Sequence, residues 1–95
     1  MAFDPGYMEA ALAAALGDNP ALVRELRMAF TESAAAQLVA LERAHHATEW
    51  TRAAYRLRGL AASFDATELM AAAEQAVAAS PGDRHALAAV RAAID

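Results

Sequence analysis

Residues 48–64 read TEWTRAAYRLRGLAASF. When these residues are placed at about 100° each, the angle of an α-helix, the apolar side chains fall on one narrow stripe. The stripe consists of Trp50, Ala54, Leu57, Ala61 and Phe64. Apolar residues that recur every three and four positions are typical of a helix that packs one face against a core. The segment therefore predicts an amphipathic helix over residues 48–63, with Thr48 as its N-cap.

The composition of the whole chain favours helices. Alanine, the best helix former, accounts for 30 of the 95 residues, and 58% of the residues are hydrophobic. β-branched residues are scarce. No segment alternates apolar and polar side chains with the period of two that a half-buried strand requires. We therefore predict an all-α fold in a single domain, residues 1–95.

Turn and capping residues divide the chain into predicted helices. The expected helices cover residues 7–16, 20–44, 48–63 and 66–79, and a last one follows a turn at residues 80–83 and ends at Ile94. Asn19 or Asp18 caps the second helix, and Asp65 or Thr67 caps the fourth. Short connections make successive helices antiparallel neighbours. The prediction is an antiparallel up-down four-helix bundle with a short N-terminal cap helix.

The long helix predicted over residues 20–44 has an apolar stripe of its own. That stripe consists of Val23, Leu26, Phe30, Ala34, Gln37 and Leu41, at spacings of three and four. Gln37 is its one polar member. The spacing predicts that this stripe faces the core.

Composition and charge exclude several classes of protein. Cysteine is absent, which excludes a disulfide scaffold and a thiolate-bound zinc or iron–sulfur site. The formal net charge of −4 argues against a nucleic-acid binder, which needs a basic face for phosphates. The longest stretches without a charged residue run about nine positions, whereas a membrane-spanning helix needs roughly 20 apolar residues. Residues 1–16 include Asp4 and Glu9 but no Lys or Arg, unlike a secretory signal, so we expect a cytoplasmic protein without nucleic-acid or membrane partners.

The face of residues 48–64 that points away from the apolar stripe is unusual. Tyr55 lies about 140° from the centre of the stripe, and Gly59 lies one turn further on. The residues around them are Arg52, Arg56, Arg58, Ala62 and Ser63. A mid-helix glycine costs about 1 kcal/mol relative to alanine. A glycine that points outward therefore indicates that another molecule approaches the backbone closely.

Charge is segregated onto the same segment. Residues 48–64 carry a net charge of +2, whereas the rest of the chain carries −6. Such a basic ridge suits an acidic partner surface, because complementary charge steers the two proteins together and fixes the register in which they bind. Exposed aromatic residues and arginines are also the commonest anchors of protein interfaces.

Residues 55–59, which read YRLRG, and the following LAASF resemble the signature of histidine-containing phosphotransfer (HPt) domains. That family reads His-x-Leu-Lys-Gly followed by small residues. Further segments also fit, so the resemblance covers nearly the whole chain. These segments are Phe3-Asp4-Pro5, Gly17-Asp18-Asn19-Pro20 and Trp50.

The resemblance implies a fold, partners and roles for individual residues. HPt domains are four-helix bundles whose exposed histidine receives a phosphoryl group from a response-regulator aspartate and hands it on. The implied partners are a receiver domain and a sensor histidine kinase. Gly59 would leave room for the partner, and Arg58, in place of the family's lysine, would face the phosphoryl group.

Tyr55 stands where the family has its histidine, and this departure changes the expected chemistry. A free imidazole has a pKa of about 6.5, whereas a phenol has one of about 10 and is a poor nucleophile without a base. An aryl phosphate would also be a stable end product. We therefore expect a degenerate HPt domain that docks a receiver domain without relaying phosphate. Its expected docking residues are Arg52, Arg56, Arg58, Gly59, Ala62 and Ser63. Asp65, where many members have glycine, is a second departure that we expect to alter only the turn.

Two alternatives lead to different functions. The helical surface could serve an interaction or homodimerisation module unrelated to phosphorelay, although we expect a monomer. Residual phosphotransfer could use Tyr55, His45, His46 or His85, but none of the histidines has a glycine four residues on. Adjacent histidines on a helix point about 100° apart, so we expect no metal site. The sequence has no paired carboxylates, nucleophilic triad or phosphate loop, so we expect neither an enzyme nor a cofactor.

Overall fold

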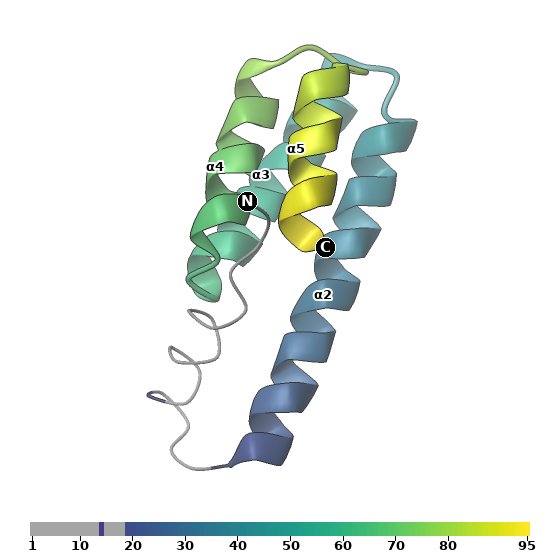
Figure 1. Cartoon of the computed structure of the whole chain (residues 1–95). Coiled ribbons are helices and arrows are strands. Elements are labelled where there is room, and N and C mark those ends of the chain that lie inside the picture. The colour runs from purple at the N-terminus through teal and green to yellow at the C-terminus, as the bar shows by residue number, and fades with distance from the viewer. Residues whose placement is uncertain (1–13, 15–18) are drawn as a thin grey trace.

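The computed structural model describes residue 14 and residues 19–95, and four α-helices account for most of these residues. The helices are α2 (Pro20–Arg43), α3 (Ala47–Ser63), α4 (Thr67–Ala78) and α5 (Arg84–Ile94) (Figure 1). No described residue lies in a strand, which confirms the all-α prediction. In this part of the chain the predicted helix ends lie within one residue of the observed ones. The short helix predicted over residues 7–16 lies almost entirely outside the described residues.

Two of the described helices begin at side-chain caps, and the sequence predicts one of the two, Asn19. Asn19 Oδ1 accepts a hydrogen bond from the Leu22 N–H at 3.1 Å, so Asn19 is the cap of α2. Pro20 follows it in the first turn, where a missing N–H costs nothing. Asp83 Oδ1 accepts from the Ala86 N–H at 2.8 Å and caps α5 in the same way. These bonds satisfy donors that the first helical turn leaves free.

The start of α3 differs from the prediction, because Thr48 is not its cap. The N-cap is His46, whose carbonyl accepts from the Trp50 N–H at 3.0 Å and whose side chain makes no capping bond. Glu49 reaches backward instead, and its Oε1 accepts from the His45 N–H at 3.3 Å. A carboxylate in the first turn also suits the positive end of the helix dipole. The Thr48 prediction was wrong because the helix already begins at Ala47, so Thr48 lies inside its first turn.

The predicted caps of α4, Asp65 and Thr67, are also wrong. The N-cap is Ala66, and no side chain caps the helix. Asp65 has a φ of 56° and closes α3, because its N–H donates to the Ala62 carbonyl at 3.4 Å and the Ala66 N–H donates to the Ala61 carbonyl at 2.9 Å. These two bonds form a Schellman motif. Asp65 therefore takes the left-handed position that usually belongs to glycine, and it ends one helix where it was expected to begin the next.

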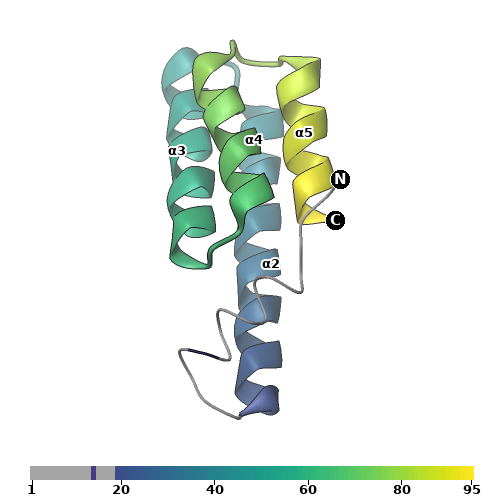
Figure 2. The same cartoon turned by 60° about the vertical axis from the view of Figure 1, so that its left-hand side comes forward.

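Each described helix packs against two others. α3 contacts α2 and α4, and α5 contacts α4 and α2. Figure 1 shows the α2–α3 and α4–α5 connections at one end of the molecule and the α3–α4 connection at the opposite end. Figure 2 shows that α2 extends well beyond the other three helices. This closed cycle of contacts fits a four-helix bundle.

Alanine supplies most of the buried residues in the described helices. Small side chains allow helices to approach closely but bury little area each, so the few large side chains matter more. The largest fully buried side chains come from all four helices, and they are Trp50, Leu41, Leu57, Leu69 and Val90.

Trp50 joins α3 to α4. Its side chain is fully buried, and its Nε1–H donates to the Ala76 carbonyl oxygen at 2.7 Å. The apolar stripe predicted on α3 is confirmed, since its first four members are fully buried. Phe64, the fifth member, is half-buried, and its ring centroid lies 5.0 Å from that of Phe30 on α2. The stripe therefore faces both neighbours of α3.

The apolar stripe predicted on α2 is only partly buried. Phe30 and Leu41 are buried, whereas Leu26 and Gln37 remain half-buried. The half-buried state of Gln37 places a polar side chain at the edge of the core.

None of the described helices combines the length and the hydropathy that crossing a membrane would require.

We predict that Trp50→Phe lowers the free energy of unfolding by about 1–3 kcal/mol, because it removes the hydrogen bond to Ala76 and leaves a void beside α4. Urea denaturation followed by circular dichroism measures the change. Val39→Ala is the control, because Val39 is 42% exposed and such surface changes usually stay within about 0.5 kcal/mol. Equal denaturation midpoints for the two variants would contradict the role of the indole.

Candidate functional site

Tyr55 lies on the outer face of α3, as the helical periodicity predicts. Its side chain is 47% exposed. The guanidinium carbon of Arg58, one turn along, lies 4.8 Å from the centroid of the tyrosine ring. A cation in this position is attracted to the face of the ring by about 0.5–1 kcal/mol at an exposed site. The contact holds an aromatic ring and a positive charge side by side on the surface.

Gly59 is also exposed on this face, one turn beyond Tyr55. A Cβ atom built on Gly59 would meet no described atom within 4 Å. The Gly59 carbonyl accepts from the Ser63 hydroxyl at 3.0 Å, so the serine side chain lies against its own helix. Packing among the described residues therefore gives no reason for a glycine here. A helix backbone left bare to the outside remains open to close approach by another molecule.

All the predicted docking residues are exposed, but they do not form one cluster. Arg58 lies against Tyr55, whereas Arg52 and Arg56 lie toward α2. Arg52 also borders a shallow hollow beside Tyr55. Ala62 and Ser63 continue the face beyond Gly59 with small side chains. They are exposed, as are Arg52, Arg56 and Arg58. The basic ridge thus divides between the Tyr55 face and the side that faces α2.

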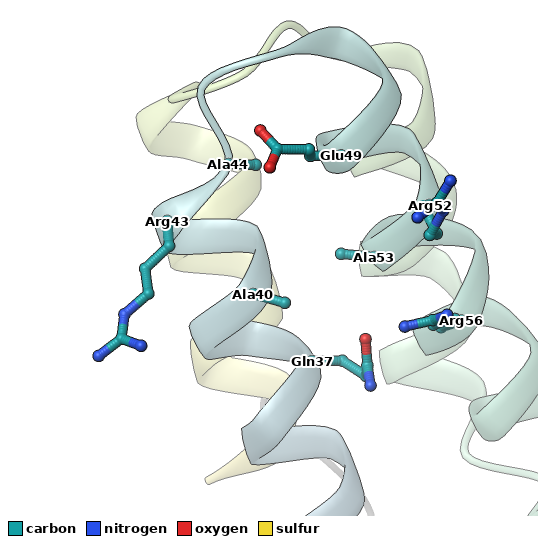
Figure 3. A pocket seen from close by; sticks show the side chains of 8 residues that line it. All are labelled: Gln37, Ala40, Arg43, Ala44, Glu49, Arg52, Ala53 and Arg56. Carbon is teal, nitrogen blue, oxygen red and sulfur yellow. The ribbon is translucent and has the colours of Figure 1, made fainter.

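A groove of about 270 Å³ separates α2 from α3 on that second side (Figure 3). Its floor is apolar and is formed by Ala40, Ala44 and Ala53. Gln37, Glu49, Arg52 and Arg56 surround the floor. Arg43 borders the groove as well, but its side chain points away from it in Figure 3.

Gln37 is a site residue that the sequence prediction missed. Its Oε1 atom is buried and has no hydrogen-bond partner. In Figure 3 its side chain extends from α2 into the groove, toward Arg56. The available signal is its position as the one polar member of an apolar stripe, but the spacing of that stripe predicts only that it faces the core.

The three histidines lie away from the Tyr55 face. His45 and His46 are exposed in the α2–α3 connection, and His85 is exposed in the first turn of α5. Within residue 14 and residues 19–95, no three His, Cys, Asp or Glu side chains come together as metal ligands would.

No protein-family model matches the chain, and neither a curated protein nor a solved structure matches it.

We predict that Gly59→Ala raises the free energy of unfolding by about 0.5–1 kcal/mol, because alanine favours the helix and meets open space. Thermal unfolding measures the gain, which corresponds to a rise in Tm of roughly 4–8 °C per kcal/mol for a domain of this size. Gly82→Ala is the matched comparison. Gly82 has a φ of 84°, so alanine there is strained and stability should fall. A loss of stability in Gly59→Ala would reveal an internal constraint on that glycine.

Proposed function

We propose that the protein is a degenerate HPt-type module that binds a response-regulator receiver domain through the α3 face around Tyr55 and Gly59, without relaying phosphate. One observation carries the proposal. An exposed tyrosine ring, with an arginine guanidinium 4.8 Å from its centroid, lies one turn from a bare helix backbone at Gly59. An anchor, a charge and an open backbone on one face are what a partner surface needs for close docking.

The proposal includes the arrangement of the whole chain. Residues 1–95 would form one antiparallel up-down four-helix bundle, with residues 7–16 as a short N-terminal cap helix. The alternation of the connections between the two ends in Figure 1 and the cyclic helix contacts support this arrangement. In such a bundle α3 packs against two neighbours and keeps its outer face free for a partner.

The surface chemistry of α3 suits an acidic partner. Arg52, Arg56 and Arg58 concentrate positive charge on one helix of a chain with a net charge of −4. Complementary charge steers the encounter and sets the register of the complex. Beyond Gly59, the small side chains of Ala62 and Ser63 give the face low relief, so that a partner element can lie close to the backbone.

The same face is poorly suited to accept a phosphoryl group. A phenol needs a base to become a good nucleophile, and the charged group that lies over the Tyr55 ring is Arg58. A guanidinium carries only donors and does not take up a proton. The proposal therefore makes the protein a cytoplasmic, monomeric binding module and not an enzyme. A sensor histidine kinase would be a further partner.

A second candidate function, a homodimerisation module, draws on α2. Met28 is 62% exposed and Val39 is 42% exposed. Their separation places them about 20° apart around the helix, on one face. A dimer formed through this face would leave Tyr55 and Gly59 unused. Light scattering that shows a dimer, unchanged in Gly59→Arg, would favour this candidate over receiver docking.

We predict that Tyr55→His gains phosphoryl uptake from phosphorylated receiver domains encoded in the same genome, whereas the natural protein gains none. An imidazole at this exposed position supplies the nucleophilic ring nitrogen that the phenol lacks. Incubation with each labelled receiver, followed by a test for acid-labile phosphate on the variant, measures the transfer.

The control is a second substitution in the Tyr55→His background. Gly59→Arg places a large side chain on the docking face and should abolish uptake, whereas Ala88→Arg adds the same charge at an exposed position of α5 and should preserve it. If Tyr55→His accepts no phosphate and no receiver binds the natural protein, receiver docking is wrong.

A further inference from the structure

The groove between α2 and α3 combines an apolar floor with charged and polar walls. Its volume of about 270 Å³ is slightly below the roughly 300–1,000 Å³ typical of pockets for drug-sized ligands. A molecule that fills it must therefore be small. The groove lies beside the Tyr55 face but is not part of it, since Gln37 and the alanines of α2 form its other side.

One wall of the groove has an excess of positive charge. Arg52 and Arg56 lie one turn apart on α3, both are exposed, and neither forms an ion pair within the described part of the chain. Like charges four residues apart on a helix repel each other. Among the groove's lining residues the one carboxylate is Glu49, whose Oε1 already accepts from the His45 N–H at 3.3 Å. The two guanidinium groups are therefore available to a doubly charged anion.

The opposite wall presents an acceptor without a donor. Gln37 Oε1 is buried and unpartnered, and the side chain extends across the groove toward Arg56 in Figure 3. A buried acceptor without a donor is unfavourable, and native structures usually provide one from protein or solvent. A ligand that fits this groove should thus carry a hydrogen-bond donor close to its negative charge.

We propose that the groove binds a small hydroxylated phosphate monoester, with the phosphate on Arg52 and Arg56 and a hydroxyl donating to Gln37 Oε1. A phosphate monoester has close to two negative charges at neutral pH and three acceptor oxygens, which match two guanidinium groups. A carboxylate has one charge and matches one of them. The groove shares Arg52 and Arg56 with the proposed docking face, whereas Gln37 belongs to the groove alone, so Gln37→Leu tests the ligand site apart from receiver docking.

Titration of the full chain with glycerol 3-phosphate, followed by two-dimensional amide NMR, tests the proposal. The expected result is saturable shifts at the residues that line the groove, at millimolar ligand. Methyl phosphate keeps the charge but lacks the hydroxyl, and it should bind about tenfold more weakly. Glycerate keeps a hydroxyl but has a single charge, and it should also bind more weakly than glycerol 3-phosphate.

Three variants separate a built site from general surface attraction. Gln37→Leu should weaken the binding of glycerol 3-phosphate about tenfold and leave the affinity for methyl phosphate unchanged, because it removes only the hydrogen-bond acceptor. Arg56→Gln should weaken the binding of both ligands. Arg56 is exposed, so the substitution should leave the fold intact. Arg84→Gln is the control of equal charge, since Arg84 is exposed at the start of α5 and outside the groove.

The outcomes are distinct from those of receiver docking. The proposed site would be contradicted by chemical shifts that spread over the whole surface or by a titration that does not saturate. An equal loss of affinity in Arg84→Gln and Arg56→Gln would contradict it as well. Receiver binding is then measured separately with Gly59→Arg, which lies outside the groove. Failure of either proposal leaves the other one testable by its own variants.

Discussion

The contact between the Trp50 indole and α4 sets the orientation of α3, and the surface features of the protein depend on that orientation. The indole is fully buried and donates to the Ala76 carbonyl at 2.7 Å. A tryptophan buries about 150–250 Å², far more than an alanine side chain can. Once Trp50 points inward, the helical period turns Tyr55 by about 140° toward the opposite side. The exposed ring and the bare backbone at Gly59 follow from this orientation, which the other fully buried members of the stripe, Ala54, Leu57 and Ala61, share.

Positive charge on α3 borders two different features. On one side Arg58 lies over the Tyr55 ring, and on the other side Arg52 and Arg56 line the groove that α3 forms with α2. Arg52 also borders the hollow beside Tyr55, so the two features share an edge. A single basic helix in an acidic chain can thus present a docking face and a ligand groove. The packing of α2 against α3 decides which arginine belongs to which feature.

The helix ends show where local sequence signals hold and where they do not. Asn19 and Asp83 cap their helices because a side-chain oxygen of each accepts from an N–H group that the first helical turn leaves free. Asp65 has the same chemistry, but the Schellman motif that closes α3 holds it at a φ of 56°. Its backbone conformation ends the preceding helix, and Ala66 becomes the N-cap of α4 without a side-chain bond. The preference of a residue type for caps therefore does not tell which of two adjoining helix ends it serves.

Helix content, the bounds of the helices and the exposed position of Tyr55 follow from neighbouring residues in the chain. They could be predicted because a period of about 3.6 residues is a local property of the backbone. The Trp50–Ala76 hydrogen bond, the ion pair between Arg91 and Glu42 at 2.7 Å and the surroundings of Gln37 could not be predicted in this way. Each depends on the axial offset and rotation of one helix relative to another that is distant in sequence. Periodicity identifies which face of a helix turns inward, but the side chains that meet across a groove are set by how the separate helices pack.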